Sequence, residues 1–182
     1  MLDSIKILEE HLKKEEKCDL VIIKMLNYNR QKIYNLPIKP SPNLPNKRSI
    51  NLYPSLCLFE RTTVSIGRGT DFPFQHFGAP FIKSNYSFTP KSGDGSKYPK
   101  HENTRCFGKD LSTLSLDSLR NINSLNFNWL VKSFKMSNEA LDFFNKNDFF
   151  NLLAGTDKIM NLIKGGANGF QIRETYQNDL EK

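Results

Sequence analysis

The chain has 182 residues, of which 38% are hydrophobic and 25% charged, with a formal net charge of +7. This composition is typical of a globular protein with one domain or two small ones. No apolar run approaches the ~20 residues that cross a bilayer, which excludes a membrane-spanning helix. The positive charge favours anionic partners, but the basic residues are scattered and no aromatic side chains alternate with them, which argues against a nucleic-acid-binding protein.

The cysteines and the first residues further limit the class of protein and its cellular location. Residues 1–5 have neither the basic nor the apolar region of a secretory signal, so a cytoplasmic location is the default expectation. No ligand spacing for a metal is present, and we expect no cofactor. Three cysteines are too few for a disulfide framework and too far apart for a zinc pattern, so we expect them to pack as small hydrophobic side chains: Cys18, Cys57 and Cys106.

The first elements predict an α/β layer. Asp3 or Ser4 caps a helix that ends near Lys17 and has apolar positions at helical spacing. Residues 19–25 are a short, continuous apolar run, which is typical of a strand buried on both faces of a parallel sheet.

Prolines organise the next segment. Residues 31–45 contain four of them, which predicts an extended, stiff path. This frame either presents the Asn43 amide to a ligand or holds it in an Asx-turn. Residues 46–52 predict a helical turn, and residues 55–62 predict a second buried strand with Glu60 near its end.

A change of composition near Phe81 predicts a domain boundary, which gives domains at 1–81 and 82–182. Beyond it we expect strands at 86–89 and 104–111, joined by a loop at 91–103 that lacks the spacing of a phosphate-binding loop. The remainder predicts helices with aromatic cores at 125–134, 138–150, 157–164 and 169–180, with Thr156 as a cap and two glycines as a stop.

Two charged residues in the apolar, aromatic stretch 39–82 are candidates for a site. Glu60 has apolar neighbours, so its carboxylate must be paired or have a raised pKa. It is therefore either a catalytic acid or one half of a structural ion pair with Arg61 or Arg68. Arg68 stands between two glycines, where its guanidinium can bind a carboxylate or phosphate. Two lone histidines, at 76 and 101, are interpreted as ordinary polar residues.

Motifs in this stretch and beyond it resemble one family. The chain is similar to the NamZ-like (YbbC-like) exo-β-N-acetylmuramidases, glycoside hydrolases long known as a domain of unknown function. The resemblance is carried, in order, by Ser41-Pro42-Asn43-Leu44-Pro45, Leu58-Phe59-Glu60, Gly67-Arg68-Gly69-Thr70, Gly78-Ala79-Pro80-Phe81, Phe88-Thr89-Pro90-Lys91-Ser92-Gly93, Cys106-Phe107-Gly108 and Leu153-Ala154-Gly155-Thr156-Asp157.

The resemblance implies a fold and a function. The fold expected is the end of a Rossmann-like α/β catalytic domain, followed by a small α+β auxiliary domain. The function expected is that of an incomplete peptidoglycan exo-β-N-acetylmuramidase that releases terminal N-acetylmuramic acid in cell-wall recycling. Its partners would be peptidoglycan fragments and a separately encoded N-terminal half, and the family is often exported. The alternative is a non-catalytic module that binds muropeptides or a partner protein.

The resemblance also assigns residues. It implies that Arg30, Asn43, Arg68 and Thr70 bind substrate, and that Glu60 assists catalysis, because the chief catalytic glutamates would lie in a preceding region. Arg61 stands where the family usually has glycine, and its bulk is expected to narrow a sugar subsite.

Overall fold

The computed structural model describes residues 21–180 except 22, 30, 31, 123, 140, 141 and 145–148. It divides the chain into two compact units, Met1–Tyr34 and Asn35–Lys182. The helix predicted from Asp3 or Ser4 lies outside the described residues. Within the predicted strand at 19–25, Val21 and Ile23 are 82% and 90% exposed and neither belongs to a strand. The prediction of a buried strand is therefore wrong for the described part of this stretch.

The second unit begins with a helix that the sequence marks clearly. Helix α2, Lys47–Leu56, starts at Asn46, whose side chain accepts a hydrogen bond from the Ser49 N–H while the Ser49 hydroxyl oxygen accepts one from the Asn46 N–H. This reciprocal pair is a capping box. The helix continues into the 3₁₀-helix η1, Cys57–Arg61.

The strand predicted at 55–62 is therefore wrong. Short apolar runs satisfy both a buried strand and a buried helical face. Here Leu52, Leu56 and Phe59 are 1% exposed or less, and their spacing of four and three residues is that of a helix. The helical turn predicted at 46–52 is confirmed and is longer than expected.

A three-stranded antiparallel sheet covers this helical segment. The strands are β1, His76–Ala79, β2, Tyr86–Phe88, and β3, Cys106–Asp110, in the order β1-β3-β2. The strands predicted at 86–89 and 104–111 are confirmed, whereas β1 was not predicted. Phe59 of η1 stacks on Phe77 of β1 with ring centroids 5.0 Å apart, which joins the two layers.

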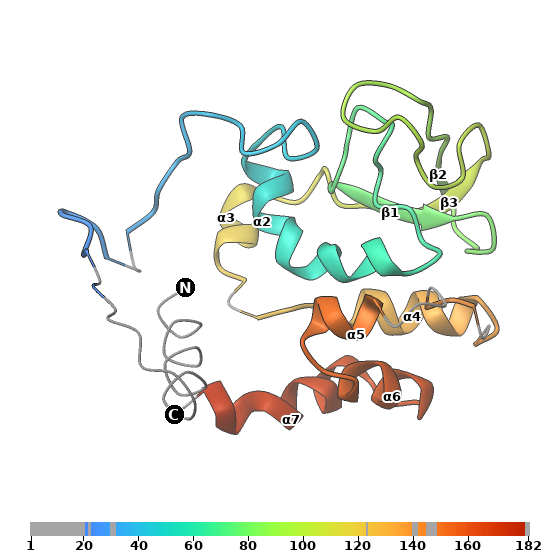
Figure 1. Ribbon diagram of the computed structural model, residues 1–182. Helices are drawn as coiled ribbons and strands as arrows, with labels where there is room; N and C mark the ends of the chain where they lie inside the picture. The colour runs from blue at the N-terminus through green and yellow to red at the C-terminus, as the bar shows by residue number, and fades with distance from the viewer. Residues whose placement is uncertain are drawn as a thin grey trace. The chain divides into compact units, whose positions relative to one another are not determined.

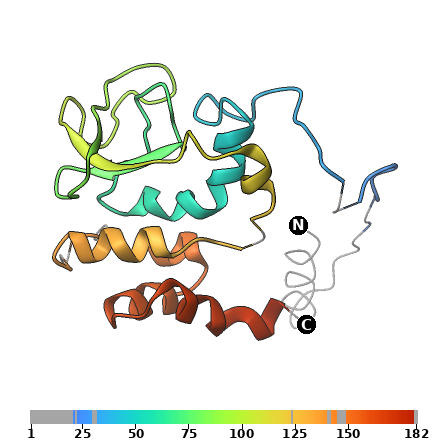
Figure 2. The ribbon, with the colours of Figure 1, turned by 180° about the vertical axis from the view of Figure 1, so that it is seen from behind.

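Helices form the remaining layers. They are α3, Leu116–Arg120, α4, Asn128–Met136, α5, Phe149–Ala154, α6, Lys158–Lys164, and α7, Gly169–Leu180. Figures 1 and 2 show the sheet, the α2-η1 segment, α4 with α5, and α6 with α7 as successive layers of this unit. The predicted helices near 125–134, 157–164 and 169–180 are confirmed, and only the end of the one at 138–150 is described as a helix.

Aromatic side chains fill the core between these layers, as predicted. Phe143 and Phe150 are 0% and 1% exposed, and both contact Phe144 edge to face. Cys106 is buried as expected, Cys57 is half-buried, and Cys18 lies outside the described residues. Across the described ranges, no helix is long and apolar enough to span a membrane.

The described residues thus form an α+β fold with an antiparallel sheet, and the predicted parallel α/β layer is not seen among them. The boundary near Phe81 stays a prediction. β1, before this residue, pairs with β3, after it.

Candidate functional site

The loop at residues 67–70 separates two hollows on the surface of the second unit. Gly67 and Gly69 both have φ of +78°, a backbone conformation that favours glycine. A Cβ atom at Gly69 would overlap the carbonyl oxygen of Lys91, so the 91–103 loop approaches this glycine closely. The Lys91 N–H also donates to the Gly69 carbonyl at 2.8 Å. Arg68 lines one hollow and Thr70 lines the other.

The first hollow, called here the Arg68 pocket, has a volume of about 230 Å³. The Arg68 Nη2 donates to the Glu60 Oε1 at 2.6 Å, and the two side chains are 39% and 26% exposed. Two partners were predicted for Glu60, Arg61 and Arg68. The ion pair forms with Arg68, whereas the Arg61 guanidinium lies 3.5 Å from the centre of the Phe149 ring. Partly exposed ion pairs contribute about 0–1 kcal/mol to stability. Both side chains therefore stay accessible from the pocket, and the pair contributes little to the stability of the fold.

Lys100 also lines the Arg68 pocket, and no sequence pattern predicts it there. Its ammonium has three N–H donors and lies 2.9, 2.9 and 2.6 Å from the carbonyl oxygens of Phe59, Glu60 and Thr62, with that of Val64 farther away at 3.3 Å. Burial lowers the pKa of Lys100 to about 8, and the nearby Glu60 carboxylate opposes that shift. The ammonium therefore predominates at pH 7 and fixes the backbone that carries Glu60.

The second hollow, called here the His76 pocket, has a volume of about 700 Å³ and contains Asn43 and Thr70. The Asn43 Nδ2 donates to the Gly95 carbonyl at 2.7 Å, and the residue is 9% exposed. Its amide nitrogen therefore holds the 91–103 loop in place. The Asn43 N–H in turn contacts the Ser41 hydroxyl at 3.2 Å.

His76 organises this pocket through both ring nitrogens. Its Nε2 lies 3.0 Å from the Thr70 Oγ1, and its Nδ1 lies 2.7 Å from the Tyr86 hydroxyl. The Thr70 hydroxyl donates to the Gly67 carbonyl at 2.7 Å, so it accepts from Nε2–H, which leaves Nδ1 to accept from Tyr86. The Thr70 hydrogen is therefore committed to the loop, whereas the Tyr86 oxygen keeps lone pairs for a ligand.

The environment of His76 keeps the ring neutral. The residue is 1% exposed, and the Phe88 ring stacks on the imidazole with centroids 4.0 Å apart. Burial lowers the pKa of His76 from 6.5 to about 4, and the Asp110 carboxylate opposes that shift. The interpretation of His76 as an ordinary polar residue missed this role. The second lone histidine, His101, is bound by its Nε2 to the Thr63 carbonyl at 2.6 Å.

We expect His76 to make stability fall as the solution is acidified. Between pH 6.5 and 4 the unfolded chain binds a proton at this histidine and the folded chain does not, so unfolding is favoured as pH falls. The full loss is about 3 kcal/mol. Thermal melts of the wild type and of His76→Gln between pH 6.5 and 4 measure this loss, as a steeper fall of the melting temperature with decreasing pH in the wild type. Parallel curves for the two proteins would contradict it.

The structure brings the predicted residues together in two groups. Glu60 and Arg68 share one pocket, and Asn43 and Thr70 share the other, with residues 67–70 between them. Arg30 lies outside the described residues. No pattern in the sequence marks Lys100 or Tyr86, because each reaches the site through contacts with distant parts of the chain.

Comparisons with known proteins assign the chain to a family. The family model described as "Exo-beta-N-acetylmuramidase NamZ, C-terminal" matches residues 51–182. Peptidoglycan beta-N-acetylmuramidase NamZ of Bacillus subtilis (strain 168) is 30% identical over an alignment of 186 positions, which covers 90% of this chain and 43% of that protein.

Solved structures agree. A crystal structure of a DUF1343 family protein from Bacteroides fragilis NCTC 9343 matches with a TM-score of 0.86 and 41% identity, over 99% of this chain and 50% of that one. A second DUF1343 family protein from the same organism has a TM-score of 0.65 and 19% identity over 98% and 52% of the two chains, and shares the fold. The chain thus spans about half the length of the relatives it matches, and it belongs to the NamZ family, of which it carries the C-terminal part.

Proposed function

We propose that the chain is the C-terminal part of a peptidoglycan exo-β-N-acetylmuramidase and that its Arg68 pocket receives the terminal N-acetylmuramic acid. The observation that carries this proposal is the Arg68–Glu60 pair, 2.6 Å apart and open to the pocket. The named activity of the Bacillus subtilis relative supports the choice of substrate.

The charge of the Arg68 pocket suits this sugar. N-acetylmuramic acid differs from N-acetylglucosamine by a lactyl ether that carries a carboxylate. Three cationic side chains and one carboxylate line the pocket: Arg61, Arg68, Lys100 and Glu60. The bond to Glu60 uses one of the five N–H donors of Arg68, so the guanidinium retains donors for a ligand carboxylate.

Glu60 then takes an assisting role. Glycoside hydrolysis generally needs two carboxyl groups on either side of the glycosidic bond. Glu60 supplies one acidic group at the pocket, and Asp71 lines the other hollow. In this proposal the chief catalytic carboxylates belong to a Rossmann-like domain whose end is residues 1–81, and residues 82–182 are the auxiliary domain. The part of the relatives that this chain does not match would supply those carboxylates.

The experiment compares release of N-acetylmuramic acid from a chromogenic muramide by three samples. These are the chain alone, the N-terminal half of a NamZ-family relative alone, and the two mixed. We expect release from the mixture only, and less release when the chain carries Glu60→Gln. Binding of the sugar without release from any sample would instead favour a non-catalytic binding module.

Arg68→Lys tests the carboxylate-binding group directly. Lysine keeps the positive charge and loses the planar fork, so the Kd for N-acetylmuramic acid is expected to rise by about tenfold or more. The melting temperature should hardly change, because Arg68 is 39% exposed. Calorimetric titration measures the Kd. Arg105→Lys is the matched control, because Arg105 donates to the Ser87 hydroxyl and does not line the pocket. Unchanged binding by Arg68→Lys would rule out this role.

A further inference from the structure

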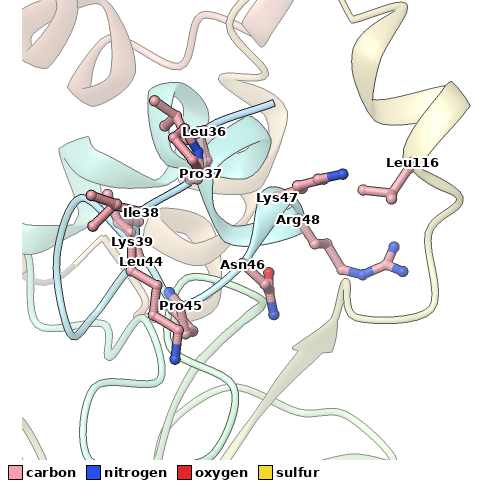
Figure 3. Close-up of a pocket in the computed structure, with 11 residues that line it drawn as sticks. Leu36, Pro37, Ile38, Lys39, Leu44, Pro45, Asn46, Lys47, Arg48 and Leu116 are labelled. Carbon is pink, nitrogen blue, oxygen red and sulfur yellow. The ribbon is translucent and has the colours of Figure 1, made fainter. Parts of the chain in front are cut away.

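A third hollow lies at the start of α2 and has a volume of about 530 Å³. Its walls combine apolar side chains, such as Leu36, Ile38 and Leu44, with three cationic ones, Lys39, Lys47 and Arg48. Figure 3 shows Lys47 and Arg48 extending from the beginning of α2 on the side of Leu116. We call it the Arg48 pocket.

The charged side chains that line the Arg48 pocket are all positive. No aspartate or glutamate is among the described residues that line it, and the first turn of α2 has no acidic residue. The capping box of Asn46 and Ser49 already engages the backbone at the helix start. The attraction for an anion therefore comes from the side chains of Lys39, Lys47 and Arg48, to which the helix dipole adds.

Two buried donors near this pocket lack acceptors. The Arg48 Nη1 and the Gln75 Nε2 are buried without a hydrogen-bond partner among the residues that the structure describes. Gln75 is 3% exposed, and its amide oxygen accepts from the Nδ2 of Asn46, which lines the Arg48 pocket. Buried donors are normally paired, so we expect a bound ligand to supply an acceptor for Arg48, which lines the pocket, whereas Gln75 lies behind it.

The three hollows adjoin one another in a row. Pro45 lines both the Arg48 pocket and the His76 pocket. Neighbouring residues of the 67–70 loop separate the His76 pocket from the Arg68 pocket, with Gly69 on one side and Arg68 on the other. A linear ligand can therefore continue from one hollow to the next.

We propose that the Arg48 pocket binds the carboxylate of a second N-acetylmuramic acid, two sugars along the glycan from the terminal one. The proposal rests on the proposed function. Peptidoglycan glycan alternates N-acetylmuramic acid, which carries a carboxylate, with N-acetylglucosamine, which is uncharged. The row repeats this order, because cations dominate the two outer pockets, whereas the His76 pocket contains Asp71 and Asp94 beside Lys91. The preferred ligand is then a glycan of at least three sugars whose lactyl carboxylates are free.

The test measures binding of two peptide-free glycans to the full chain by calorimetric titration. They are the disaccharide MurNAc-GlcNAc and the trisaccharide MurNAc-GlcNAc-MurNAc, with tri-N-acetylchitotriose as an uncharged ligand of the same length. The trisaccharide is expected to bind at least tenfold more tightly than the disaccharide, and the uncharged one no more tightly. Arg48→Gln and Lys47→Gln should each remove most of this gain and leave the disaccharide unaffected.

The control variant is Lys132→Gln, which removes one exposed charge on α4 and should keep the full gain. Lys47 is exposed, so its variant keeps the test valid if Arg48→Gln folds poorly. Equal affinities for the disaccharide and the trisaccharide would overturn the inference and leave the proposed function standing. If neither glycan binds, the proposed function itself fails. A gain that survives both variants would also overturn the inference.

Discussion

Replacing Lys100 by methionine is expected to lower the free energy of unfolding by about 3 to 4 kcal/mol. The ammonium lies within 3.3 Å of four carbonyl oxygens, and methionine fills similar space without any donor. The Phe59 carbonyl keeps its bonds from the Thr62 N–H and hydroxyl, whereas each of the other three carbonyls, left unpaired and out of water, would destabilise the fold by about 1–3 kcal/mol, less what water entering from the Arg68 pocket recovers. Chemical denaturation measures the change.

Lys97→Met is the matched control for this variant. Lys97 is an exposed lysine of the same loop, and its ammonium lies 5.6 Å from the Tyr98 ring. Its replacement should change the free energy of unfolding by less than about 0.5 kcal/mol. If the two variants were equally stable, the carbonyl contacts of Lys100 would contribute nothing, and the rigid support proposed for Glu60 would have to be abandoned.

Gly108→Ala is expected to be at least as damaging, with a loss of about 3 kcal/mol or more. Gly108 of β3 lies opposite Gly78 of β1, and a Cβ atom there would overlap the carbonyl oxygen of Phe77. That oxygen is backbone, so relief requires β1 to move away from β3. Because β1 begins at His76, the movement also displaces the imidazole from Tyr86.

The control for Gly108→Ala is Gly93→Ala. A Cβ atom at Gly93 would meet nothing within 4 Å, so the same change should be nearly neutral. Thermal melts give the stabilities. The fluorescence of Tyr86, obtained as the difference between each protein and the same protein with Tyr86→Phe, reports on the contact with His76. A Gly108→Ala protein that melts with the wild type would mean that the strands are farther apart than described.

Sequence patterns predicted the elements whose structure depends on interactions between neighbouring residues. Helix α6 was found because two glycines end it, with Gly165 at its C-terminal cap and Gly166 at φ of +85°. Strand β2 was found from alternating side chains. The run at 55–62 was misread because its apolar residues satisfy both periodicities, and only its packing beneath β1 decides between them.

The candidate site was predictable only in part. The glycines around Arg68 mark a turn, and an acidic group among apolar residues requires a partner, so Arg68 was one of two partners named for Glu60. The contact of His76 with Tyr86 joins residues 10 positions apart, and those of Lys100 with the carbonyls around Glu60 join residues 36 to 41 positions apart. Such pairings depend on how the layers stack, which a pattern within one element does not encode.

The anchoring of the 91–103 loop has a consequence for ligand affinity. Contacts through Lys91, Asn43 and Lys100 fix this irregular segment near its beginning, middle and end. Ordering a free backbone opposes association by about 1–2 kcal/mol for each residue that becomes fixed. Here that entropy is lost when the polypeptide folds, so a ligand that contacts this loop meets a preorganised surface, and more of the contact energy remains as affinity.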